Sequence, residues 1–135
     1  MKQILSLILL ISSFSVWANC NVYIAATGYH HDSGNVIQFN FDPMFFKKGY
    51  TVVGEIEEAD FVLDANGDQI QGRYFAHAQT EMILSDVRGE ELIRVENSKR
   101  CYTTSCAVSD FVKSFNKSYK EMSKKLQGCN GSTHL

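Results

Sequence analysis

The sequence lacks the features by which nucleic-acid-binding proteins and most enzyme families are recognised. Its formal net charge is only −2, from 13 basic and 15 acidic residues, so it has no excess of positive charge for a polyanion. It contains no Gly-x-Ser-x-Gly nucleophile motif, internal repeat or low-complexity segment. These absences exclude nucleic acid as a general partner, and we expect no cofactor, no metal and no assignable catalytic residue.

Long hydrophobic runs are also missing after the first 18 residues. The apolar stretch 4–11 follows Lys2 and precedes Val16-Trp17-Ala18, a small-x-small cleavage site. It is shorter than the roughly 20 residues that span a bilayer. We expect residues 1–18 to be a signal peptide cleaved after Ala18, which leaves no transmembrane span. An uncleaved amphipathic anchor is the alternative.

Cysteine is scarce but even in number. Four cysteines in an exported chain are typical of a disulfide framework, and their spacing fits no common zinc pattern. They are Cys20, Cys101, Cys106 and Cys129. Lipid modification at Cys20 requires a small residue before it, whereas Asn19 stands there. We therefore expect residues 19–135 to form a single disulfide-linked domain that is periplasmic or secreted.

The N-terminal half of this domain predicts a strand and then a helix. Residues 21–26 are rich in strand formers. Apolar residues in 36–48 fit either an alternating strand or one helical face. Pro43 suits a first helical position and Gly49 suits a helix end. We therefore expect a helix over residues 36–48 that is bent or restarted at Pro43.

The middle of the chain predicts two strands joined by a tight turn. Residues 51–64 form the second strand, interrupted by an acidic patch. Asn66-Gly67 is a preferred pair for two-residue hairpins, because each residue tolerates positive φ. In the third strand, 74–84, small and apolar residues alternate with polar ones. This alternation predicts that one face is covered by a helix.

The C-terminal part predicts a fourth strand, 91–97, and a long helix that ends near Gly128. Apolar residues recur at helical spacing and fill one face. They are Val108, Phe111, Val112, Phe115, Tyr119, Met122 and Leu126. The expected fold class is α+β, a two-layer β-α-β-β-β-α sandwich. It has a four-stranded mixed sheet with two helices on one face.

This topology favours one disulfide pairing of the three possible. The first and fourth strands run parallel, so a helix that returns from the fourth strand ends where the first strand begins. This places Cys129 near Cys20 and leaves Cys101 near Cys106. The helix is about 30 Å long, too far for Cys106 to reach Cys129.

Two groups of polar residues are candidates for a site. His30 and His31 are the best candidates for a metal or acid–base role, but adjacent side chains of an extended segment point apart, so a solvated loop is the favoured interpretation. Four lysines follow the last helix opposite its apolar face, where they either contact an anionic lipid or glycan or form an ordinary solvated face. They are Lys113, Lys117, Lys120 and Lys124.

Three short motifs carry a resemblance to a known group of proteins. They are the segments 48–53 (KGYTVV), 58–63 (EADFVL) and 86–89 (DVRG). In this order they resemble the small α/β modules of the TolB amino-terminal type and of lipoproteins such as LpoB. The chain departs from the lipoproteins because it has no lipobox at Cys20.

The resemblance implies a module that binds other envelope proteins and has no catalytic residues to carry over. The expected function is therefore a non-enzymatic periplasmic binding or accessory module whose partner is another envelope protein. The alternative is a small envelope hydrolase or metal-binding protein that uses His30, His31 and nearby carboxylates.

Overall fold

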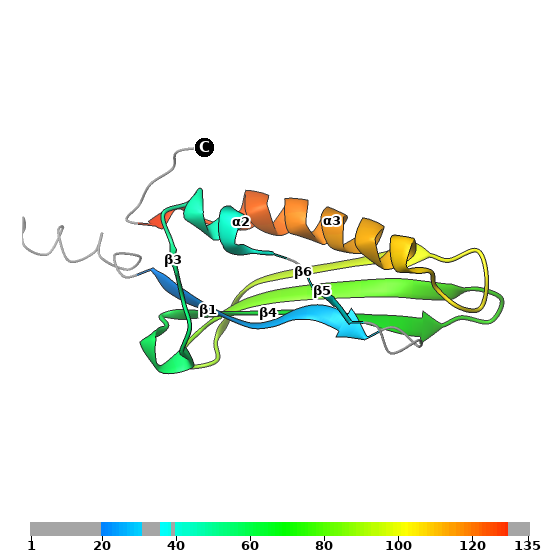
Figure 1. Ribbon diagram of the computed structural model, residues 1–135, viewed down its shortest axis with the longest axis horizontal. Coiled ribbons are helices and arrows are strands. Elements are labelled where there is room, and N and C mark those ends of the chain that lie inside the picture. Colours follow the sequence, from blue (N-terminus) through cyan, green and yellow to red (C-terminus); the bar gives the residue numbers. More distant parts are fainter. Residues whose placement is uncertain (1–19, 31–35, 39, 130–135) are drawn as a thin grey trace, which may run out of the picture.

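A computed structural model describes residues 20–30, 36–38 and 40–129. Six strands and two α-helices lie in this part of the chain, with one short 3-10 turn, η1 (Figure 1). The order along the chain is β1 Asn21–His30, β2 Val36–Gln38, α2 Asp42–Phe46, β3 Thr51–Val53, η1 Ile56–Glu58, β4 Phe61–Gln71, β5 Ala76–Asp86, β6 Glu91–Arg100 and α3 Val108–Lys125.

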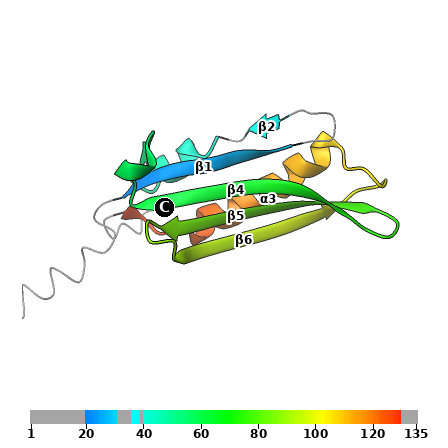
Figure 2. The same cartoon turned by 90° about the horizontal axis from the view of Figure 1, so that it is seen from below.

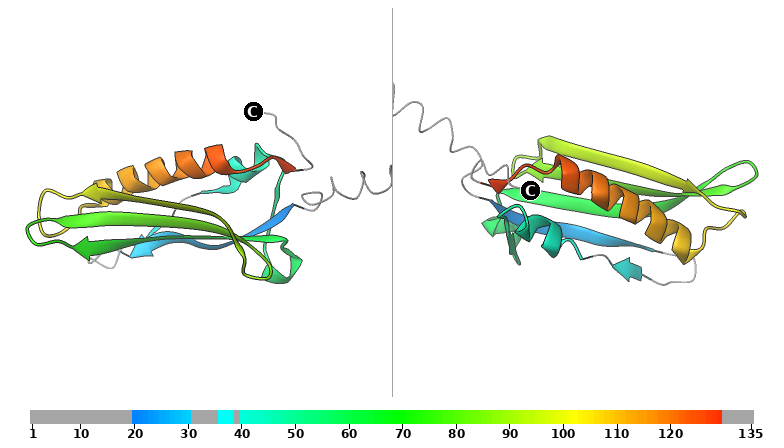
Figure 3. Two further views of the ribbon diagram at one scale, coloured as in Figure 1. Left: turned by 180° about the vertical axis from the view of Figure 1, so that it is seen from behind. Right: turned by 90° about the horizontal axis from the view of Figure 1, so that it is seen from above.

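The strands form one mixed sheet in the order β2-β1-β4-β5-β6 (Figure 2). β1 runs parallel to β4, and the β4–β5 and β5–β6 pairs are antiparallel. Both helices cover the same face of this sheet (Figures 1 and 3). The α+β class, the mixed sheet and the two helices are thus confirmed.

The prediction of four strands is wrong because the second expected strand is divided. β3 pairs with one side of β1, and β4 pairs with its other side. The acidic patch between them forms η1, which carries the chain from one side of β1 to the other. β2 adds a further strand beside the end of β1.

The expected helix over residues 36–48 is also wrong over most of its length. Residues 36–38 are strand β2, and only Asp42–Phe46 are helical, with Pro43 in the first turn. Residues 36–38 are therefore extended, in agreement with the strand interpretation of this segment rather than the helical one. At the helix end, Gly49 has φ of +84°, and its Cβ position would lie 3.4 Å from the Cβ of Cys129, which explains a glycine there.

Asn66 and Gly67 do not form the predicted turn. They continue β4, where they pair with Glu81 and Thr80 of β5. The ladder continues to Gln71 opposite Ala76, so the turn lies at residues 72–75. Pairing along the whole of β5 outweighs the local turn preference of this dipeptide, because turn propensity is a weaker term than an extended ladder with a buried face.

The core lies between the helices and the inward face of the sheet. The alternate residues of β5 that were expected to face a helix are all fully buried: Ala76, Ala78, Thr80, Met82 and Leu84. The alanines let α3 approach the sheet closely. The helix contributes Phe111, Phe115 and Met122 to the same core, and Leu126 follows directly after it, whereas Val108 is 40% exposed.

Two disulfides close the domain at opposite ends of α3. Cys20 is joined to Cys129 and Cys101 to Cys106, with Cα–Cα distances of 5.9 and 5.2 Å. These are the pairs that the parallel first and last strands require. At the first disulfide, the amide of Cys129 donates to the carbonyl of Lys48 at 2.7 Å, and Thr51 donates to Cys20 at 2.9 Å.

Candidate interaction surface at the tip of the sheet

The end of the sheet farthest from the Cys20–Cys129 disulfide presents exposed aromatic and basic side chains. Two segments form it, the β4–β5 turn at residues 72–75 and the end of β6 with its following loop, 99–106 (Figure 1). We call this surface the basic–aromatic tip. Its members are Arg73, Tyr74, Phe75, Lys99, Arg100 and Tyr102.

Each aromatic ring of the tip has a cationic partner. The Arg100 guanidinium lies 4.1 Å from the ring centroid of Phe75. The corresponding distances are 5.3 Å from Lys99 Nζ to Tyr102 and 5.7 Å from the Arg73 guanidinium to Tyr74. Contacts of this kind stabilise the positions of both partners.

The two tyrosines of the tip are nevertheless open to solvent. Tyr74 is 71% exposed and Tyr102 is 85% exposed. A depression of about 390 Å³ lies among Phe75, Lys99, Arg100, Cys101 and Tyr102. The tip thus offers both protruding rings and a concave patch to a partner.

Backbone hydrogen bonds and a disulfide hold the two segments together. The Ala76 amide donates to the carbonyl of Thr103 at 3.0 Å, and Cys101 donates to the carbonyl of Ala76 at 2.8 Å. The Cys106 amide donates to Oε1 of Gln69 at 2.9 Å. The Cys101–Cys106 bond closes the loop itself. The tip is therefore a preorganised surface, not a pair of independent loops.

The open face of the sheet carries a separate charged cluster around Arg94. Its guanidinium donates to Glu81 and Glu91 at 2.7 Å each and to Glu96 at 3.0 Å. The hydrogen bond to Arg94 lowers the pKa of Glu91. Glu81 and Glu96 can share one proton, which raises the pKa of Glu81 and lowers that of Glu96. One guanidinium thus forms ion pairs with three carboxylates.

Buried hydroxyl groups lie between α3 and the sheet. Thr80 Oγ1 is 2.9 Å from Ser114 Oγ and 2.8 Å from Ser118 Oγ. The side-chain amide of Asn97 donates to Ser118 Oγ at 2.9 Å. These partners are hydroxyl and amide groups, which do not activate a serine as a nucleophile. The cluster satisfies buried polar groups and ties the helix to β5 and β6.

No protein-family model and no curated protein sequence matches the chain. Among solved structures, PelC of Paraburkholderia phytofirmans, a dodecamer, is similar with a TM-score of 0.47 and 11% identity, over 82% of this chain and 90% of that chain. The LpoB C-terminal domain of Salmonella enterica is similar with a TM-score of 0.40 and 12% identity, over 66% and 91%. The similarity to LpoB-like modules is weak and concerns the fold.

The predicted histidine site falls mostly outside the described residues. His31 lies outside the described residues. His30 is the last residue of β1, where its backbone pairs with Val36, so the expectation of a loop is wrong at His30. In the part of the chain that the structure describes, no three His, Cys, Asp or Glu side chains are grouped to hold a metal. The described helices also include none with the length and apolar character of a membrane span.

The lysine row on the last helix is exposed. Lys113, Lys117, Lys120 and Lys124 lie on the side of α3 that faces away from the sheet. Their contact with a lipid or glycan stays a prediction, since an exposed helix face is equally typical of ordinary solvation.

The sequence alone does not reveal the basic–aromatic tip, because its two segments are more than 20 residues apart in the chain. Arg73 is followed by two aromatic residues, and Lys99 and Arg100 lie three and two positions before Tyr102. Each pattern by itself is common. Only the pairing of β5 with β6, which sets His77 opposite Arg100, brings the two segments together.

Proposed function

We propose that the protein is an exported, non-enzymatic binding module that contacts another protein of the cell envelope through its basic–aromatic tip. The observation that carries this proposal is the clustering of three cation–aromatic pairs on one disulfide-closed platform. Disulfides persist in oxidising compartments, which supports export. Cleavage after Ala18 would deliver the domain as residues 19–135.

The composition of the tip suits a protein partner. Tyrosine, phenylalanine and arginine are enriched in protein interfaces, and tyrosine and arginine are prominent among the residues whose truncation costs most binding energy. The tip holds Tyr74, Tyr102, Phe75 and Arg100 within one surface. Because its backbone is already held by hydrogen bonds, little ordering cost accompanies binding.

The charge of the tip indicates the chemistry of the partner surface. Arg73 and Arg100 are exposed cations, and Lys99 lies 3.8 Å from its nearest carboxylate, Asp110. The tip therefore keeps an excess of positive charge. An acidic partner surface with an apolar centre would be complementary to it.

Site-specific photo-crosslinking in the exporting cell tests this proposal. A photo-reactive residue at Tyr74 or Tyr102 is expected to capture one envelope protein, identified by mass spectrometry. The same residue at Phe46, which is 59% exposed at the opposite end of the molecule, is the control. Intact-mass measurement of the purified protein checks that residues 1–18 are absent.

Purified components then measure the contribution of the tip. The double variant Tyr74→Ala/Tyr102→Ala is expected to weaken binding by about 30-fold, the effect of losing an energetically important contact. Phe46→Ala is expected to leave the affinity unchanged. If Lys117→Glu or Lys120→Glu weakens binding and the tip variant does not, the lysine row on α3 is the contact surface and the proposal is wrong.

A further inference from the structure

β6 is an open edge of the sheet. It is the last strand of the strand order in the described part of the chain, ten residues long, with β5 as its neighbour on one side (Figure 2). The view from above shows that α3 lies over the sheet and does not cover this edge (Figure 3). An edge of this length is a template for pairing with another strand.

The hydrogen bonds to β5 show which backbone groups of β6 point outward. Both backbone groups of Ala76, the first residue of β5, point toward the β6 side of the sheet. The Ala76 amide donates to the carbonyl of Thr103, and its carbonyl accepts from the amide of Cys101. Antiparallel pairing alternates, so Ala78, Thr80 and Met82 also bond toward β6, to Lys99, Asn97 and Val95. The intervening residues of β6 therefore direct their backbone groups to the open edge: Arg94, Glu96 and Ser98.

The side chains beside these groups are self-complementary. Arg94 and Glu96 flank Val95 symmetrically, and both lie on the open face of the sheet. We propose that β6 pairs antiparallel with β6 of a second copy of the chain, about a two-fold axis at Val95. Arg94 of each copy then lies directly opposite Glu96 of the other, and each pair exchanges backbone hydrogen bonds.

Charge selects this register over its neighbours. An axis at Glu96 would place the two copies of Glu96 opposite each other, and an axis at Arg94 would do the same with the two copies of Arg94. Like charges directly opposite in a sheet are unfavourable, whereas opposite charges are favourable. Charged side chains on an edge strand usually prevent pairing with another chain. Here the order of the charges favours pairing of two β6 strands in the register centred on Val95.

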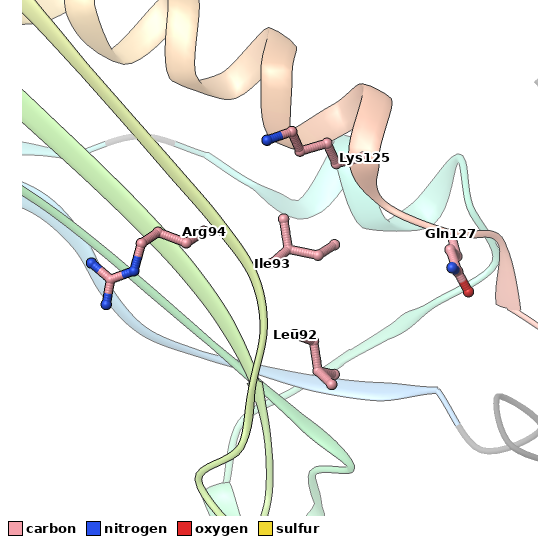
Figure 4. A pocket seen from close by; sticks show the side chains of 5 residues that line it. All are labelled: Leu92, Ile93, Arg94, Lys125 and Gln127. Atoms are coloured by element: carbon pink, nitrogen blue, oxygen red, sulfur yellow. The ribbon is translucent and has the colours of Figure 1, made fainter.

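The surroundings of the edge fit an added strand. In one copy, the single guanidinium of Arg94 forms ion pairs with Glu81, Glu91 and Glu96, so a second guanidinium beside Glu96 relieves an excess of negative charge. At the edge of β6 near the end of α3, a hollow of about 480 Å³ is lined by Leu92, Ile93, Arg94, Lys125 and Gln127 (Figure 4). The proposed register brings Asn97 of the second copy opposite Ile93, at this hollow.

The two-fold axis has a consequence for the tip. The basic–aromatic tip lies at one end of β6, so antiparallel pairing directs the two tips to opposite ends of a continuous sheet. The dimer would then be bivalent. The dimer itself does not depend on the tip being a binding surface, so the two proposals can fail separately.

A pair of charge reversals tests the dimer on the full mature chain. Sedimentation equilibrium should show a dimer for the wild type. Arg94→Glu places carboxylates opposite each other between copies, and Glu96→Arg does the same with guanidinium groups, so each is expected to weaken dimerisation by more than about tenfold. An equimolar mixture of the two variants restores opposite charges in every pair, so a heterodimer is expected.

Recovery in the mixture cannot come from misfolded variants. Lys47 directly follows α2, Glu57 lies in η1, and both are exposed. Lys47→Glu and Glu57→Arg change the charge by the same amounts away from β6 and should leave the dimer intact. Hydrogen exchange should slow at the amides of Arg94 and Glu96 on dimerisation. A wild type that stays monomeric at high concentration, or a dimer that survives both reversals, would overturn the proposal.

Discussion

Tyr50 joins the start of the sheet to the end of α3. Its hydroxyl donates to the carbonyl of Gln127 at 2.7 Å, and its ring lies edge-on to Phe45 and Phe61 at centroid distances of 5.4 and 6.0 Å. The side chain is 3% exposed. Burial raises the pKa of the Tyr50 phenol far above its usual value near 10, because the charged phenolate is poorly solvated there.

We expect Tyr50→Phe to lower the free energy of unfolding by about 1 kcal/mol at neutral pH, the usual net value of one hydrogen bond. Chemical denaturation of both proteins measures the difference. Phe46→Ala, an exposed change in the adjacent helix, is the control.

The pH dependence of the free energy of unfolding at alkaline pH provides a second test of the same variant. A phenol with a raised pKa in the folded state contributes stability that is complete below pH 10, the pKa of the unfolded chain. That stability is lost as the pH rises toward the folded value. Tyr50→Phe should therefore lose less stability between neutral and strongly alkaline pH than the wild type. Identical pH profiles would show that Tyr50 is not the group responsible.

The loop after β6 is an element whose conformation depends on its own disulfide. Cys101 and Cys106 are only 5 positions apart, so their bond restricts the unfolded chain little, by about 2 kcal/mol in the chain-entropy model. Its larger effect is on the loop that carries Tyr102 and that accepts a hydrogen bond from Ala76 through Thr103.

We expect Cys106→Ser to lower global stability by about 2 kcal/mol at most and to disorder this loop. Hydrogen exchange should accelerate at the Ala76 amide, and affinity for the partner of the tip should fall. Exchange in α3 beyond its first turn should stay unchanged. An unaltered Ala76 amide would mean that backbone pairing alone holds the tip.

The Cys20–Cys129 disulfide acts on the whole molecule. Its cysteines are 109 positions apart, and the bond fastens the beginning of β1 to the segment after α3. Closing so long a loop restricts the unfolded chain by about 4–5 kcal/mol in the chain-entropy model. Backbone hydrogen bonds from Cys129 to Lys48 and from Thr51 to Cys20 hold each cysteine against residues 48–51. The two ends of the domain are therefore also joined through this segment.

We expect Cys20→Ser/Cys129→Ser to lower the free energy of unfolding by several kcal/mol, more than Cys106→Ser does. The double substitution avoids a free thiol, so the measured loss reflects the missing bond. Equal losses for the two disulfides would contradict the assignment of the long-range bond as the main stabiliser.

The sequence alone was sufficient for the elements whose period is strong. The 3.6-residue spacing from Phe111 to Leu126 specifies α3, and the alternation along β5 specifies which residues meet it. Strand order then pairs the cysteines, because a helix that returns from the last strand must end near the start of the first. These features follow from local pattern and from simple rules of connection.

Tertiary structure decided the features for which local preference was ambiguous or misleading. Asn66-Gly67 became part of β4 because eleven consecutive pairs with β5 outweigh the preference of one dipeptide for a turn. Residues 36–38 form a strand because their backbone groups pair with the edge of β1. The basic–aromatic tip and the open edge of β6 depend on which strands are neighbours. That order reflects the burial of a common apolar face, a property of the assembled sheet that no single segment contains.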